Sequence, residues 1–565
     1  MSAQVQGPRK GGTFIVCAHA ADPVTLNPGL TSSVTSHVAC VPAFNSLLET
    51  NMDLSVRPGL AERWEMSTDG LTYTFYLVKN ATWHDEKKFT SADVKFTFEQ
   101  VLLPFHPYGQ VYFGVIQSIE TPDDYTVRIK LTKPRPSFLL LISSTGFAPI
   151  LPKHIFEGTN IRENPANWKP IGTGPFKFVE YVKGDRVVFE RNPNYWRANK
   201  PYADRIIAKI IPKEETQVVA IQKGEIDCLG MWLSPAGFKR LEGLPDVNVI
   251  PLKGTAAPRI TWLYFNLDHP ILKNLKVRQA IVHVIDKNKI SEVSREGSSP
   301  PAVGPVHYST GWAFDPNLQP SYPFDLKKAN QLLDEAGYPR KEGGVRFKLA
   351  INDIPGQTYN NDAEMIKDWL KEVGIEVDHQ LISNVVATDL LFNRREFDMA
   401  IRTFMVGPDP TIALAATFDS KQIGKGSFTN CMGYTNLETD ALLEQAQVEM
   451  DPAKRRSLML QWQRIIMTEL PAYPLIHDTS REAYRKEWIG VPANPWLTLS
   501  MFAENIWWTQ GTLIEAPKTT STTTTKPPEV VPGPDLTVIA GTLVIVAIVA
   551  AAAVYVLHKK RVKKS

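Results

Sequence analysis

Short segments with strand-like patterns and longer segments with helical periodicity alternate along the chain. In the first half, three segments rich in β-branched and aromatic residues predict strands: 73–78 (YTFYLV), 125–131 (YTVRIKL) and 186–190 (RVVFE). In the second half, apolar positions recur at helical spacing instead. The alternation continues from 11 to about 510 without an internal repeat, which is typical of an α/β fold.

Two of the predicted helices have clear ends. Asp325 is placed to cap the first helix, and Gly337 is placed to end it. Gly374 ends the second helix, and a strand follows from 375. The apolar stripes of these helices are Ala329, Leu332, Leu333 and Ala336 in the first, and Met365, Ile366, Trp369, Leu370 and Val373 in the second.

Two further segments predict helices with a buried face. Segment 277–293 is expected to form one helix, and segment 451–470 forms a long helix that Pro471 stops. These stripes indicate hydrophobic core rather than cofactor sites. The apolar face of the first consists of Val277, Ile281, Val284 and Ile285, with Arg278 and Asp286 on its polar side, where a structural ion-pair role is expected.

The C-terminal region predicts a membrane anchor. Residues 536–557 are 22 consecutive residues without a charge, or about 33 Å of helix at ~1.5 Å per residue. The basic tail 558–565 (HKKRVKKS) follows directly, so we expect the tail in the cytoplasm and the preceding body outside the cell. Residues 1–10 contain no apolar stretch, so either a signal peptide is missing or insertion relies on the C-terminal helix.

Residues 515–535 (EAPKTTSTTTTKPPEVVPGPD) predict a stalk between the body and the anchor. Their Thr and Pro content cannot form a packed core, and an extended stalk would reach up to about 65 Å at ~3.1 Å per residue. The same composition occurs in O-glycosylated stalks and in unmodified disordered linkers. Both alternatives hold the body away from the membrane.

Composition excludes several functions. The formal net charge is +3. Five of the 62 basic residues lie in the last eight residues of the chain, and the rest of the chain has 57 basic and 59 acidic residues. The body therefore lacks the basic excess of a nucleic-acid-binding protein. The sequence contains no G-x-S-x-G, P-loop or H-E-x-x-H motif, so we expect no enzyme. The four cysteines form no CxxC pair and are expected to be buried, with at most one or two disulfides and no metal or cofactor.

Several segments occur in an order that resembles solute-binding protein family 5, which includes the dipeptide, oligopeptide and nickel receptors of ABC importers. The resemblance extends over nearly the whole body, and the ordered set is more specific than any one segment. The segments are KGGTF at 10–14, DPVTLNP at 22–28, the run 58–99, IGTGPFKFVEY at 171–181, NPNYW at 192–196 and the run 264–290.

The resemblance implies a two-lobed α/β clamshell of the periplasmic-binding-protein type II class with an extra β-rich domain. We expect domain I at 11–43, 174–262 and 484–512, domain II at 44–173, and domain III at 263–483. Ligand would be enclosed as the lobes close. The pore and ATP hydrolysis would come from ABC permease subunits and their ATPases.

The resemblance also predicts where ligand binds. In peptide-binding members an Asp pairs with the ligand's amine, in a segment that corresponds here to 404–418 (FMVGPDPTIALAATF). The amine-pairing position itself falls within Met405 to Gly407, so either Asp409 substitutes or the ligand lacks a cationic amine. The expected ligand-binding residues are Phe404, Met405, Gly407, Asp409, Trp232 and Asn266.

The sequence also admits other ligands and another role. The 13 tryptophans, Trp232 and Trp262 among them, favour an oligosaccharide as the alternative to an oligopeptide, with nickel or another small ligand as further possibilities. A surface structural or adhesion protein would account for the stalk and anchor, but not for the ordered family segments.

Several residues of the family segments are expected to be structural. Gly172 and Gly174 predict a tight backbone passage, and His84 and Asp85 predict a turn rather than a metal site. Glu86 occupies the position where the family usually has Gly. The aromatic residues expected in the core are Trp64, Phe75, Trp83, Phe96 and Phe98.

Overall fold

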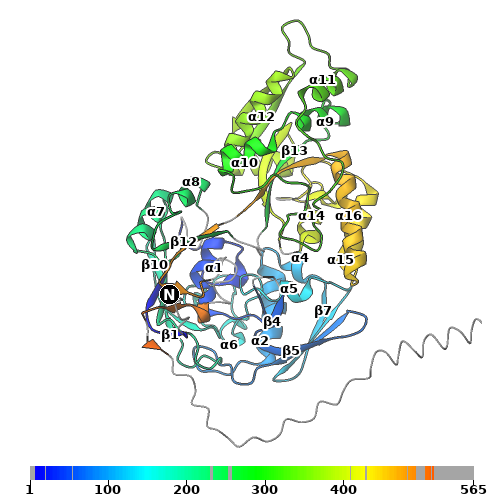
Figure 1. The fold of residues 1–565 in the computed structure, drawn as a ribbon. Helices are drawn as coiled ribbons and strands as arrows, with labels where there is room; N and C mark the ends of the chain where they lie inside the picture. The colour runs from blue at the N-terminus through cyan, green and yellow to red at the C-terminus, as the bar shows by residue number, and fades with distance from the viewer. Residues whose placement is uncertain are drawn as a thin grey trace, which may run out of the picture. The chain divides into compact units, whose positions relative to one another are not determined.

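Three larger β-sheets organise the described part of the chain (Figure 1). The described residues up to 513 belong to one unit, Met1–Ile514. The computed structural model describes residues 7–18, 21–51, 53, 55–229, 233–251, 258–407, 409–426, 429–479, 481–491, 503–510 and 512–513.

The first sheet has the strand order β2-β11-β10-β9. It consists of β2 (Thr13–Cys17), β11 (Arg205–Lys209), β10 (Arg186–Arg191) and β9 (Phe176–Val182). Strands β2 and β11 are parallel and the other neighbours antiparallel. The predicted strand 186–190 is therefore confirmed.

The second sheet is antiparallel throughout, in the order β5-β6-β8-β7. Its strands are β5 (Ala61–Met66), β6 (Thr72–Leu77), β8 (Thr126–Leu131) and β7 (Ile116–Asp123). Helix α2 (Ser91–Phe96) contacts β7 and β8. Alternate residues of β6 are buried, as a sheet with one face on a core requires, and both predicted strands of this region are confirmed.

The third sheet is mixed, in the order β15-β14-β16-β13-β17. Its strands are β15 (Ile375–Leu381), β14 (Phe347–Asp353), β16 (Met399–Met405), β13 (Arg259–Phe265) and β17 (Ala472–Asp478). The domain boundary expected between 262 and 263 therefore falls within one strand. Strand β13, which lies between β16 and β17, is buried along nearly its whole length, which fits its largely apolar sequence.

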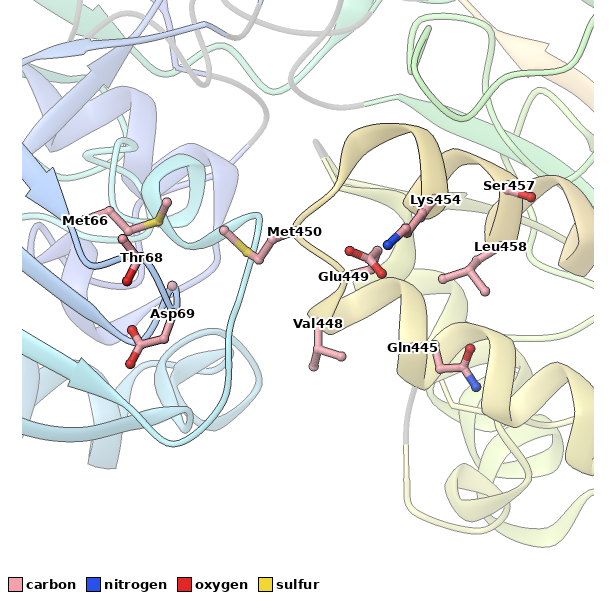
Figure 2. Close-up of a pocket in the computed structure, with 11 residues that line it drawn as sticks. Met66, Thr68, Asp69, Gln445, Val448, Glu449, Met450, Lys454, Ser457 and Leu458 are labelled. Atoms are coloured by element: carbon pink, nitrogen blue, oxygen red, sulfur yellow. The ribbon is translucent and has the colours of Figure 1, made fainter. Parts of the chain in front are cut away.

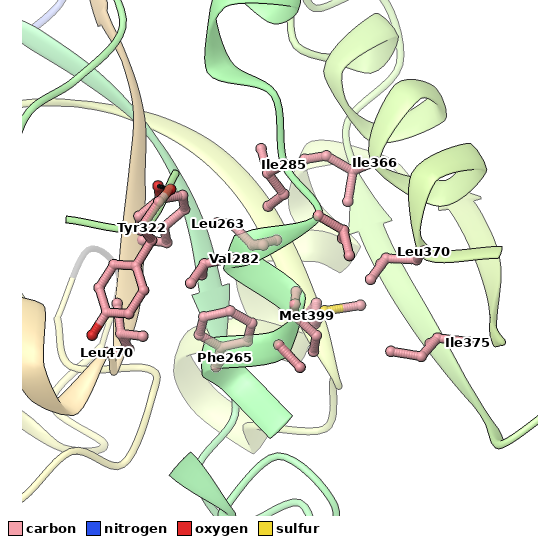
Figure 3. Packing of buried hydrophobic residues seen from close by; sticks show 14 of the residues in the cluster. Leu263, Phe265, Val282, Ile285, Tyr322, Ile366, Leu370, Ile375, Met399 and Leu470 are labelled. Atoms are coloured by element: carbon pink, nitrogen blue, oxygen red, sulfur yellow. Dashed lines mark hydrogen bonds between the residues drawn. The ribbon is translucent and has the colours of Figure 1, made fainter. Parts of the chain in front are cut away.

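Helices build a hydrophobic core against this sheet. Figure 3 shows Ile366 and Leu370 from α12 (Asn360–Glu372) directed toward Met399 of β16 and Ile375 of β15. The same core includes buried residues of α9 (Leu275–His283) and α11 (Leu326–Glu335).

A second hydrophobic core that packs against the same sheet contains several aromatic residues. It includes residues of α14 (Pro410–Phe418), α15 (Leu437–Val448) and α16 (Pro452–Glu469). Phe418 lies between two buried tryptophans, with ring centroids 5.6 Å from Trp262 and 5.3 Å from Trp462. The C-terminal helices of this region are thereby fixed to the sheet.

Smaller elements complete the described chain. They are β1 (Arg9–Lys10), η1 (Pro28–Leu30), α1 (Val34–Cys40), η2 (Val41–Ala43), β3 (Leu48–Thr50), β4 (Val56–Pro58), η3 (Thr97–Leu102), α3 (Leu103–Phe105), α4 (Gly109–Phe113), α5 (Phe138–Leu141), α6 (Lys153–Phe156), η4 (Pro165–Trp168), α7 (Glu214–Lys223), α8 (Pro235–Lys239), β12 (Val247–Pro251), α10 (Lys287–Arg295), α13 (Asn384–Thr388), η5 (Asp389–Arg394), η6 (Ser420–Gln422), β18 (Arg481–Arg485), β19 (Trp488–Ile489), η7 (Ala503–Asn505), β20 (Trp507–Trp508) and β21 (Thr512–Leu513).

The predicted helix ends at Asp325, Gly337 and Gly374 are confirmed. Asp325 accepts a hydrogen bond from Lys328 N at 2.9 Å as the cap of α11, and both glycines have positive φ. The long helix after Asp451 is confirmed as α16.

Two expectations for segment 277–293 are wrong. The segment forms two helices, α9 and α10, because Asp286 accepts hydrogen bonds from Asn288 N and Lys289 N and so begins a new helix. Arg278 is buried rather than on a polar face, and it donates hydrogen bonds to the carbonyl oxygens of Leu272 at 2.7 Å and Leu470 at 2.9 Å.

The tight backbone passage at Gly172 is confirmed. A Cβ atom at this position would lie 1.8 Å from the carbonyl oxygen of Ala43, so only glycine fits. His84 accepts a hydrogen bond from Gly172 N at 3.2 Å, and its other ring nitrogen lies 3.0 Å from Gly174 O. This ring supports the passage, and Glu86 adopts a φ of 70° in the adjoining turn.

The remaining expectations concern burial and the membrane. All four cysteines are buried, and so are the expected core aromatics apart from the partly buried Trp64. Among the described residues, no helix combines the length and the apolar character that crossing a bilayer requires. The predicted stalk 515–535 and span 536–557 lie outside the described residues.

Candidate ligand-binding site

A cavity of about 710 Å³ lies between two parts of the chain that are distant in sequence (Figure 2). One wall is the turn between β5 and β6, and the other is formed by α15, α16 and their connection. Its volume is within the range of small-molecule sites. The lining residues are Met66, Thr68, Asp69, Gly70, Gln445, Val448, Glu449, Met450, Lys454, Ser457 and Leu458.

The predicted ligand loop follows strand β16, close in structure to the same helices. Met405 ends β16 and is 36% exposed, and Gly407 has a φ of +68°. Phe404 packs edge-on against Tyr264, with ring centroids 5.6 Å apart. Met405 is thus the more accessible of the two predicted apolar contacts.

Asp409 has partners within its own helical region. It is 3% exposed and caps α14, and its Oδ1 accepts hydrogen bonds from Thr411 N at 3.0 Å and Thr411 Oγ1 at 2.8 Å. Its Oδ2 accepts from Arg455 at 2.6 Å, and the Arg455 guanidinium lies 4.4 Å from the centroid of the Trp312 ring. The carboxylate is therefore already neutralised by one cation, and its pairing with a ligand amine stays a prediction.

A group of three aromatic rings from the first half of the chain lies opposite the loop that contains Asp409. Tyr108 is 39% exposed and stacks on Tyr112, with centroids 5.3 Å apart, and Phe147 packs edge-on against both rings. Tyr112 belongs to helix α4, and Tyr108 directly precedes that helix. The exposed ring of Tyr108 offers a face on which an apolar or aromatic group can pack.

Arg135 connects this group to Asp409. It is 5% exposed, donates a hydrogen bond to Val111 O at 3.0 Å, and lies within electrostatic range of Asp409 and Arg455. Ile412 of α14 packs against the core below the second sheet. The loop around Asp409 and the region around Arg135 therefore face each other within the Met1–Ile514 unit.

Sequence reasoning did not identify Arg135 or Tyr108. The available signal was an arginine between two prolines (KPRPS), a rigid segment that follows a strand. That pattern does not show that the arginine is buried.

Of the other two predicted residues, the structure describes Asn266, whose side-chain amide is engaged by backbone carbonyls. Both hydrogens of the Asn266 amide are used within the third-sheet region, by Arg395 O at 2.9 Å and Phe397 O at 2.8 Å. Trp232 lies outside the described residues. The ligand roles of both stay predictions.

A buried ion network lies where the chain leaves the third sheet. Arg295 of α10 donates to Asp478 at 2.8 Å and to both oxygens of Asp362, at 3.1 and 3.0 Å. Burial raises the pKa of Asp362, while Arg295 opposes that shift. Such a network holds β17, α10 and α12 in one geometry. A cavity of about 60 Å³ beside it is lined by Arg259, Arg295, Asp478 and Arg481, among others.

Within the described ranges, His, Cys, Asp and Glu side chains form no group of three or more that could hold a metal ion.

Comparison with known proteins gives consistent results. The family model described as bacterial extracellular solute-binding proteins, family 5 Middle, matches residues 55–426. The heme-binding protein A of Haemophilus influenzae is 30% identical over 498 residues, which cover 82% of this chain and 87% of that protein. The dipeptide-binding protein of Escherichia coli is 30% identical over 517 residues, covering 86% and 92%.

A solved structure is similar over almost the same extent. The periplasmic binding protein DppA of Helicobacter pylori, in complex with the peptide STSA, has a TM-score of 0.72 and 27% sequence identity. The match covers 89% of this chain and 99% of that one. The similarity thus extends over nearly the whole described body.

Proposed function

Because the chain belongs to the bacterial extracellular solute-binding proteins of family 5, whose members are receptors rather than enzymes, we propose that it captures oligopeptides outside the cell for an ABC importer. The observation that carries this proposal is the similarity to a peptide-bound receptor over 89% of the chain. Delivery of the peptide to the membrane permease follows from the same role.

The geometry supports a peptide enclosed between the loop after β16 and the aromatic group around α4. Tyr108 and Met405 supply exposed apolar surface on the two sides. Gly407, with its positive φ, allows a tight turn of the loop beside the ligand. In this proposal Phe404 and Asp409 hold the loop, the first by packing and the second through Arg455.

The finer proposal on localisation rests on the sequence. Residues 536–557 would anchor the receptor in the cell membrane, with the basic tail in the cytoplasm and the stalk holding the body outside. Mild proteolysis of intact cells should then release the body by cleavage near 515.

The class of ligand can be tested by identifying the compounds that the protein retains. The full-length chain is incubated separately with a peptide pool, an oligosaccharide pool and heme, and the retained compounds are identified by mass spectrometry after removal of unbound material. We expect one retained peptide per chain, recovered uncleaved. Retention of oligosaccharide or heme without peptide, or recovery of cleaved peptides, would contradict the proposal.

A further inference from the structure

Arg135 is a buried cation with few partners. Arg135 is only 5% exposed, yet within the described part of the chain it donates a single hydrogen bond, to Val111 O. Among the residues that the structure describes, none accepts a hydrogen bond from its Nε and none forms an ion pair with it. A guanidinium has five N–H donors, and buried donors without acceptors cost stability.

The local charges do not balance. The ionisable groups near Arg135 are Asp409, Arg455 and Tyr112. Asp409 already binds Arg455 at 2.6 Å, and burial raises the pKa of Tyr112, which keeps its hydroxyl neutral. The two guanidinium groups and one carboxylate leave one positive charge uncompensated. Burial accordingly lowers the pKa of Arg135, although Asp409 opposes that shift.

We propose that Arg135 binds an acidic group of the ligand, a carboxylate held between the α4 region and the Asp409 loop. A carboxylate matches the planar guanidinium and would accept the unused N–H donors. It would also restore charge neutrality beside the Asp409–Arg455 pair. The inference rests on the proposed peptide-binding function, because a peptide supplies such a group at its C-terminus or in an Asp or Glu side chain.

The site would therefore select ligands by charge. An amine at this position would face a local positive charge, whereas a carboxylate would complete the ion cluster. This differs from the amine pairing that the sequence suggests for Asp409.

Calorimetric titration of the full-length chain tests the charge preference. The ligand is a peptide retained from the pool, compared with a version in which the C-terminus and every acidic side chain are amidated. We expect the neutral version to bind wild type about tenfold more weakly, or worse, and Arg135→Gln to bind both versions alike. Arg128→Gln is the matched control, because Arg128 is an exposed arginine in the same sheet region, and it should keep the wild-type preference.

Equal binding of both versions by wild type would overturn the inference while leaving the peptide-binding function intact. Failure of every peptide to bind would instead count against that function.

A second measurement needs no ligand. Arg135→Met should leave the melting temperature of the ligand-free chain unchanged or raise it, because it removes an uncompensated buried charge. A fall as large as that of Arg455→Met would show a structural ion pair and overturn the inference.

Discussion

At the scale of single residues, burial decides what the charged groups of this chain can do. Asp409 stands in the sequence as an acid between two prolines, open to a ligand, but in the structure its carboxylate neutralises Arg455 and caps α14. Arg135 also stands between two prolines in the sequence, but in the structure it becomes a buried cation without a counter-charge of its own among the described residues. The sequence identifies which residues are charged, but their ion-pair partners come from segments that are distant in the sequence.

The Asp409–Arg455 pair gives a prediction. Asp409→Asn should lower the free energy of unfolding by about 3 kcal/mol, because Arg455 would stay buried without its counter-charge. Denaturant unfolding measures this loss, and Asp409→Asn with Arg455→Met should recover most of it.

The matched control is Asp451→Asn, an exposed cap of α16 that asparagine can replace. If Asp409→Asn retains full stability but loses affinity for peptides with a free amine, Asp409 is a ligand residue instead.

At the scale of elements, helix ends and periodic faces could be predicted because they depend on neighbouring residues. Asp325 and Gly337 mark the ends of α11, and the buried stripe of α12 follows its 3.6-residue period. The break between α9 and α10 was missed, because the apolar spacing continues across it while Asp286 begins a new helix. The cavity of Figure 2 was also missed, since its walls are separated by more than three hundred residues.

Core packing at the element scale can be measured on α11. Leu333→Ala should lower the free energy of unfolding by about 2 to 5 kcal/mol, because Leu333 is fully buried in the core beside the third sheet. Leu437→Ala is the control: Leu437 is 79% exposed at the start of α15, so its change should stay within about 0.5 kcal/mol. Similar losses for both substitutions would contradict the packing of α11.

At the scale of the whole molecule, buried histidines set the response to acid. Burial lowers the pKa of five of them: His37, His84 and His307 to about 4, and His106 and His477 to about 3. In the unfolded chain these groups take up protons below about pH 6.5, while in the folded chain they stay neutral.

The free energy of unfolding should therefore fall as pH drops from about 6.5 toward 4, by up to about 3 kcal/mol for each histidine. Asp227, whose pKa burial raises to about 6, acts in the opposite direction, and so do the buried carboxyl groups whose pKa burial also raises: Glu49, Asp93, Asp353 and Asp362. Denaturant titrations at a series of pH values between 7.5 and 4.5 measure the slope. Constant stability across that range would show that these rings are not buried as neutral groups.

The central claim for the whole molecule is that the protein closes over a peptide held between the loop after β16 and the aromatic group around α4. Closure should shorten the separation between the turn that joins β5 to β6 and the helices α15 and α16. Spin labels at Thr68→Cys and Ser457→Cys, exposed positions on opposite walls of the cavity in Figure 2, report this separation, and the four native cysteines are buried against labelling. With a saturating retained peptide, the distance distribution measured by pulsed electron spin resonance should become shorter and narrower. A distribution that is identical with and without bound peptide would contradict the account.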